Sequence, residues 1–162
     1  MNPKNTIIAA PSVMQANVLL TVINFASILP VPRRTQAKTT YLMGLEEPNS
    51  RVTKISPTIL SVTHGGPLIF RIEITPTKIG NEVYVPVGIA FNQIVKRGVL
   101  GVTANVVKNF HSKQFFVIGT SLYFIDECLP APGTIDFEFY VFIQRQSDGA
   151  LAVIDPGIQH EN

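Results

Sequence analysis

The sequence has no tryptophan, one cysteine and three histidines, and only 15% of its 162 residues are charged. A lone cysteine cannot form a disulfide within the chain, and so few thiols and imidazoles disfavour a metal cluster or a thiol–imidazole catalytic pair. GxSxG, HExxH, CxxC and glycine-rich phosphate-binding motifs, which carry a built-in mechanism, are absent as well. We therefore predict a protein that is not an enzyme and has no catalytic residues, no cofactor and no metal.

Long hydrophobic runs are also missing. The strongest apolar stretch, residues 18–29, is interrupted by Thr21, Asn24 and Ser27, so it predicts a core strand and not a membrane span of about 20 residues. The first ten residues hold only a four-residue apolar run, which is too short for a signal peptide. Because Cys128 has no partner in the chain, these features together favour a cytoplasmic location. His64, His111 and His160 are interpreted as ordinary surface histidines.

What the chain does have is a series of short runs of Val, Ile, Phe, Tyr and Thr, closed by Pro, Gly, Asn or Asp. Short apolar runs separated by turn-forming residues are typical of an all-β domain. We predict a single antiparallel β-sandwich, jelly-roll-like, at residues 15–158, with an N-terminal arm at 1–14 and a C-terminal tail at 159–162. The expected strands lie near residues 16–24, 39–45, 52–56, 59–62, 68–75, 82–90, 99–107, 114–125, 134–145 and 151–154.

Local patterns refine this prediction. Strict alternation over residues 70–75 indicates a strand with one face in the core and the other in water. The Asp148-Gly149 pair predicts a hairpin between the last two expected strands. Apolar residues at helical spacing in 90–98, with Gly98 as a stop, are compatible with one short helix or with a strand linker. Residues 30–38 break both periodicities and predict an exposed loop.

Charge is polarised along the chain: up to Ile125 there are 12 basic and 4 acidic residues, and from Asp126 onward one basic and seven acidic. Cross-strand pairs within one sheet could cancel this polarity. Alternatively, the acidic part of one molecule docks on the basic part of another, which makes self-association salt-dependent. The candidate residues for such an assembly surface or for a ligand loop are Arg33, Arg34, Lys96, Arg97, Lys108, Lys113, Asp126, Glu127 and Asp155.

Two segments carry a resemblance to a known family. Residues 17–29 (Asn-Val-Leu-Leu-Thr-Val-Ile-Asn-Phe-Ala-Ser-Ile-Leu) resemble the opening strand of the bacterial PixA-like and AidA-like inclusion-body proteins. Residues 137–149, followed by Asp155-Pro156-Gly157-Ile158, resemble the aromatic strand, polar turn and final Asp-Pro-x-Ile with which that family closes. The resemblance implies a cytoplasmic β-sandwich that accumulates as assemblies or inclusions, and it carries over no catalytic residue.

These observations favour a structural protein whose partner is itself, as a homo-oligomer. A small-ligand or glycan-binding sandwich with its site in the end loops is the alternative. A viral coat or matrix protein shares the physics of self-assembly. However, no densely basic arm is present, so we expect no nucleic-acid partner.

Overall fold

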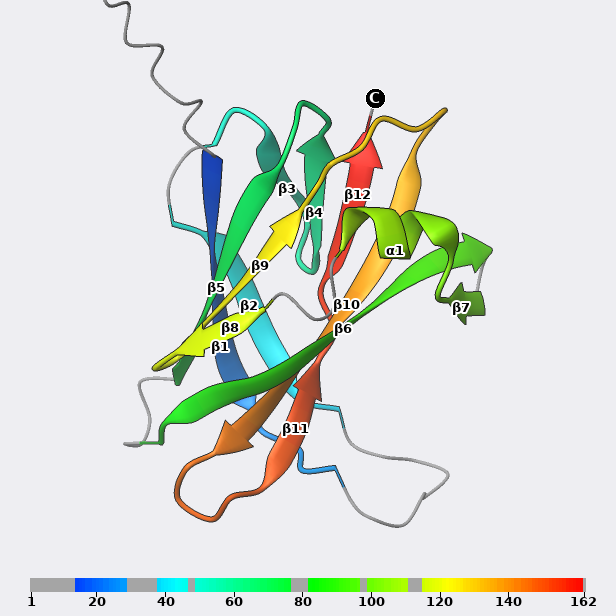
Figure 1. Ribbon diagram of the computed structural model, residues 1–162. Helices are drawn as coiled ribbons and strands as arrows, with labels where there is room; N and C mark the ends of the chain where they lie inside the picture. Colours follow the sequence, from blue (N-terminus) through cyan, green and yellow to red (C-terminus); the bar gives the residue numbers. More distant parts are fainter. Residues whose placement is uncertain are drawn as a thin grey trace, which may run out of the picture.

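The computed structural model describes residues 14–28, 38–46, 49–76, 82–96, 99–110 and 115–161. These residues form strands and one short helix (Figure 1). The strands are β1 (Met14–Asn24), β2 (Thr40–Leu45), β3 (Val52–Ser56), β4 (Ile59–Thr63), β5 (Leu68–Pro76), β6 (Tyr84–Lys96), β7 (Val99–Gly101), β8 (Phe116–Ile118), β9 (Ser121–Asp126), β10 (Ile135–Arg145), β11 (Leu151–Ile154) and β12 (Gly157–Glu161), and the helix is α1 (Ala104–Asn109).

The strands form two sheets. The smaller sheet has the order β2-β1-β5-β9-β8, and the larger has the order β3-β4-β12-β10-β6-β7, with β11 also paired to β10. The prediction of an all-β fold is confirmed, but the prediction of a purely antiparallel sandwich is wrong, because β1 pairs with β5 and β12 with β4 in parallel. In both parallel pairs, the chain passes through the other sheet between the two partner strands. A jelly roll is therefore not confirmed.

The core lies between the two sheets. In β5, Phe70, Ile72 and Ile74 are buried, whereas Arg71 and Glu73 lie on the other face, as the alternation predicted. Aromatic rings join the layers, since Phe124 of the smaller sheet contacts Phe91 and Phe139 of the larger sheet at centroid distances of 5.1 and 5.7 Å. The two sheets thus pack face to face, as expected for a sandwich.

Of the two structures that the sequence allowed for residues 90–98, the short helix is wrong. Strand β6 continues through this segment and pairs with β10 from Tyr84↔Arg145 to Gln93↔Phe137. Phe91 is buried, but Ile94 and Val95 are exposed, so the apolar residues at helical spacing do not share one core face. A long apolar partner strand outweighs a weak local helical pattern. The helix instead begins after Thr103, whose side chain accepts a hydrogen bond from the Val106 N–H.

Turns account for the remaining differences. The hairpin at Asp148-Gly149 is confirmed, with Gly149 in the left-handed region at φ 72°. Gly119, also left-handed, turns the chain between β8 and β9, so the strand expected at residues 114–125 is a hairpin. The strand expected at 99–107 ends at Gly101 and is followed by α1.

Strand β12 was not predicted, and it lies inside the larger sheet between β4 and β10. Most of the loop expected at residues 30–38 lies outside the described residues.

Candidate functional site

The nine residues predicted for assembly or ligand binding do not form one site. Arg33, Arg34, Arg97 and Lys113 lie outside the described residues, and only the backbone of Lys96 is described, at the end of β6. Lys108 is exposed in the last turn of α1.

The acidic candidates lie in different surroundings. Asp155 follows β11 and forms an ion pair with the exposed Lys38 at 3.7 Å. Glu127 is half-buried just after β9, and its N–H bonds to the carbonyl of Asn109 at 2.9 Å. Asp126 ends β9 and is fully buried, so its carboxylate does not contribute to an exposed acidic docking surface. The described structure therefore separates these three acids instead of gathering them into one patch.

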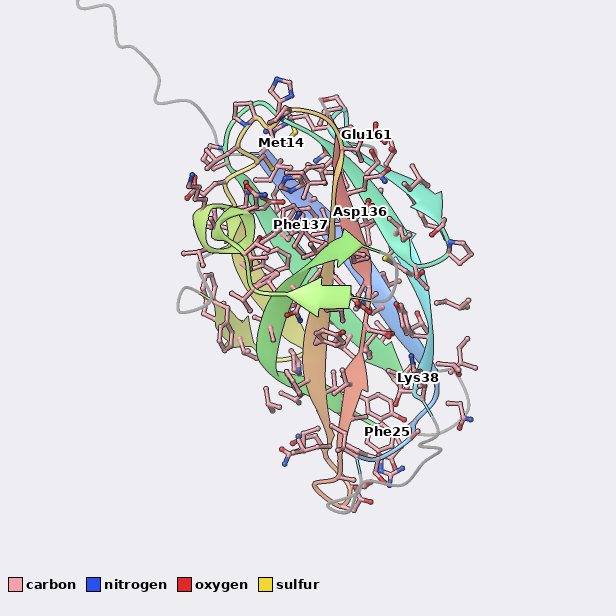
Figure 2. All side chains as sticks on the ribbon, turned by 90° about the vertical axis from the view of Figure 1, so that its right-hand side faces the viewer. Met14, Phe25, Lys38, Asp136, Phe137 and Glu161 are labelled. Carbon is pink, nitrogen blue, oxygen red and sulfur yellow. The ribbon has the colours of Figure 1, made fainter. Side chains whose placement is uncertain are left out.

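A hollow on the outer face of the larger sheet brings acidic and aromatic side chains together. The alternation in β10 turns Phe137 and Phe139 into the core and Asp136, Glu138 and Tyr140 outward. Two adjoining hollows of about 500 and 320 Å³ share Glu138 and Asp155. In Figure 2, Asp136 lies in the middle of this side of the molecule and Lys38 below it. We call these two hollows the outer groove.

Two tyrosines lie close to the carboxylates of the outer groove. Burial, together with the charge of Glu138 and a hydrogen bond to it, raises the pKa of Tyr140 to about 12. Burial and the charges of Asp155 and Glu138 also raise the pKa of Tyr41, whose hydroxyl is buried without a hydrogen-bond partner among the described residues. Both phenols are therefore neutral at physiological pH. The groove offers carboxylate acceptors and a phenol beside apolar walls, which suits a cation or a polyhydroxylated ligand.

A second polar cluster is buried between the sheets, and we call it the buried triad: Asp126, Cys128 and His160. Nε2 of His160 lies 2.7 Å from Oδ2 of Asp126, and the backbone N–H of Cys128 donates to Oδ1 of Asp126 at 2.9 Å. The carboxylate, thiol and imidazole ligand atoms all lie within 4.8 Å of one another. This set of donors could hold a metal ion.

The chain positions the buried triad through the ends of two strands. Asp126 is the last residue of β9, and its backbone pairs with Leu68 and Phe110. His160 lies on the inner face of β12, where the ring of Phe137 contacts its imidazole at a centroid distance of 4.7 Å. Strands β9 and β12 end at the same end of the molecule (Figure 1). The triad therefore links the smaller sheet to the larger one.

The thiol of Cys128 is held in an unusual backbone conformation. Cys128 has a φ of 48°, and no other described residue besides glycine has a positive φ. Such a conformation costs a non-glycine residue about 1–2 kcal/mol. Burial, followed by the charge of Asp126, raises the pKa of the thiol far above its usual range. A protonated buried thiol is a poor nucleophile, so this cluster does not resemble an activated cysteine site.

Two of these findings bear on the interpretation of single residues. Cys128 is buried, as free cysteines usually are. The interpretation of His160 as a surface histidine is wrong, because only 6% of this residue is exposed. Ile158 and His160 alternate with outward-facing residues, and this two-residue period could have indicated that His160 is buried. The signal was missed because β12 itself had not been predicted. The contact with Asp126 has no signal in the local sequence, because the two residues are 34 positions apart.

Comparison with known proteins supports the fold and adds no sequence relative. No family model matches the chain, and no curated protein matches it significantly. Among the described residues, no helix is both long enough and apolar enough to cross a membrane. A search of solved structures finds the crystal structure of the PixA inclusion body protein from Burkholderia cenocepacia, with a TM-score of 0.52 and 9% identity, over 96% of this chain and 99% of that one. The chain thus resembles an inclusion body protein of the PixA type in its fold.

Proposed function

We propose that this protein is a non-enzymatic structural protein that self-associates into ordered homo-oligomers or inclusions in the cytoplasm. The observation that carries the proposal is strand β8, whose three residues Phe116, Val117 and Ile118 are all exposed. This strand ends the smaller sheet and pairs only with β9 among the described strands. Its outer edge therefore presents apolar side chains beside backbone groups that have no strand partner among the described residues.

An edge of this kind favours pairing with a second copy. Soluble β proteins usually protect their edge strands by keeping them short or with charges, prolines or bulges. Strand β8 is short, with three residues, but it contains no charge, proline or bulge. Phe116 stacks on the ring of Tyr123, its partner on β9, at a centroid distance of 4.9 Å. A β8–β8 contact between two molecules would extend the sheet and cover these apolar residues. The likeness in fold to an inclusion body protein supports the same proposal.

The proposal is tested by the molar mass of the purified protein from light scattering after size exclusion. The wild type should have a mass several times 17.8 kDa. Ile118→Lys should weaken association at least roughly tenfold, because an unpaired ammonium group is costly to bury. Leu42→Lys is the matched control: Leu42 is 63% exposed, as Ile118 is, and lies on β2 at the opposite edge of the same sheet. A wild type of 17.8 kDa at high concentration would overturn the proposal.

A second candidate function is binding of a small cationic ligand or a glycan in the outer groove. The specific observation is the buried hydroxyl of Tyr41, which lies near the two carboxylates of the groove and has no hydrogen-bond partner among the described residues. Titration calorimetry with a polyamine and with neutral oligosaccharides would detect saturable binding. Glu138→Gln should weaken binding of the polyamine about tenfold. Asp148→Asn, on the exposed β10–β11 turn, should leave it unchanged. No saturable heat with either class of ligand would count against this function.

A further inference from the structure

We propose that the buried triad binds a single transition-metal ion of the zinc class, with Asp126, Cys128 and His160 as its ligands. This inference is independent of self-association and of the outer groove. One carboxylate oxygen, one sulfur and one imidazole nitrogen lie within 4.8 Å of one another. Zinc holds such atoms at about 2.0–2.3 Å, so ligands around one ion are separated by roughly 3–4 Å. Side-chain adjustments of about an ångström are enough to close the site.

The types of ligand select the metal. Calcium and magnesium are bound through oxygen atoms alone, whereas sulfur together with imidazole favours zinc and its neighbours in the transition series. All three residues are buried, with 0% of Asp126, 1% of Cys128 and 6% of His160 exposed. Three protein ligands leave one position of a tetrahedral ion for water. Because this site does not border the outer groove, a structural role suits it better than a catalytic one.

A metal would also satisfy the charges of this interior. The Asp126 carboxylate and a Cys128 thiolate would together neutralise a divalent ion bound between them. The other charge that acts on Cys128 is the Arg51 guanidinium, which is held by the carbonyls of Thr63 and Gly66 at 3.1 and 2.8 Å. Those bonds keep Arg51 in place when the metal displaces the proton of the thiol, which passes to solvent.

The location gives the ion a mechanical effect. Asp126 is the last residue of β9 in the smaller sheet, and Cys128 lies two residues after it. His160 lies on β12 in the larger sheet. A metal bound by all three would cross-link the two sheets at one end of the molecule. Metal binding should therefore stabilise the folded chain by mass action.

Cobalt(II) is the probe for this site, because a thiolate bound to cobalt gives a charge-transfer band. The chain has one cysteine, so the band reports on Cys128 alone. Untagged protein is refolded with one equivalent of cobalt under reducing conditions. We expect the thiolate–cobalt band together with the visible bands of a tetrahedral ion, and we expect zinc to displace both. A refolded wild type that shows no such band overturns the proposal, whether or not any variant folds.

Variants then test Cys128 and His160 as ligands. Cys128→Ser should abolish the charge-transfer band, and His160→Ala should weaken cobalt binding at least tenfold. His64→Ala is the matched control, since His64 is exposed and lies outside the triad. Excess zinc should raise the melting temperature of the wild type and of His64→Ala by roughly 5–10 °C over the same protein in chelator. Equal cobalt affinity in His160→Ala and wild type would contradict the assignment of His160.

Discussion

Glu73, on the outer face of the smaller sheet, illustrates how hydrogen bonds can outweigh burial at a single residue. Its carboxylate accepts hydrogen bonds from Arg71 at 3.0 Å, from Thr120 at 2.5 Å and from Ser121. Burial raises the pKa of Glu73, but these bonds and the charge of Arg71 outweigh burial and leave the pKa below its usual value of 4.5. A lowered folded pKa stabilises the protein above about pH 4.5, and this stabilisation is lost as the pH falls through the folded value.

We predict that Glu73→Gln lowers the free energy of unfolding by about 1–3 kcal/mol at neutral pH, because charge-assisted hydrogen bonds are replaced by weaker ones. The difference between wild type and variant should shrink as the pH falls towards 3. Urea unfolding at several pH values measures both effects. Glu46→Gln is the control, since Glu46 forms only a longer contact with Arg71, 3.7 Å, and is more exposed. A difference that is the same at neutral pH and at pH 3 would contradict the linkage to Glu73.

At the scale of strands and helices, local patterns predicted which side chains of a strand are buried, but they did not predict which strands pair with each other. Alternation in β5 and in the first part of β10 predicted the buried side chains correctly, because a two-residue period is a property of the strand itself. The parallel pairs and β12 were missed, because strand order depends on contacts between residues far apart in the sequence. The buried triad was missed for the same reason, whereas the candidate residue Asp155 does border the outer groove.

The interior position of β12 leads to a prediction of its own. Ile158→Ala should lower the free energy of unfolding by about 2–5 kcal/mol, because Ile158 is 1% exposed and its truncation leaves a cavity in the core. Ile55→Ala, the same change at an exposed position of the edge strand β3, should cost less than about 0.5 kcal/mol. Chemical denaturation of both variants provides the measurement. Equal costs would mean that β12 is not part of the core in solution.

Across the whole molecule, several acidic residues of the C-terminal part are engaged by contacts within the chain, and one of these contacts joins the two parts of opposite charge. Asp155 pairs with Lys38, and Asp148 pairs with Arg145 at 2.6 Å, a hydrogen bond that lowers the pKa of Asp148 to about 2. Asp126 is buried beside His160. These acids are already engaged within their own chain, so the described structure favours an apolar contact between molecules over the docking of an acidic face on a basic one.

The proposed oligomer should accordingly withstand salt. We predict that its molar mass stays constant or rises between low and high salt, because the burial of apolar surface is not screened by ions and is strengthened by kosmotropic salts. Light scattering at constant protein concentration across a salt series measures this dependence. A mass that falls steadily towards 17.8 kDa as salt increases would instead support electrostatic docking.

The place of β12 between β4 and β10 also constrains how the protein is made. Strand β4 ends at Thr63, and its parallel partner begins only at Gly157, roughly ninety residues later. During translation, β4 therefore emerges from the ribosome long before the strand that will cover its open edge. Until β12 is synthesised, the nascent chain exposes an unpaired strand edge, which can pair with other chains. Slow synthesis should therefore send more of the protein into aggregates than fast synthesis does.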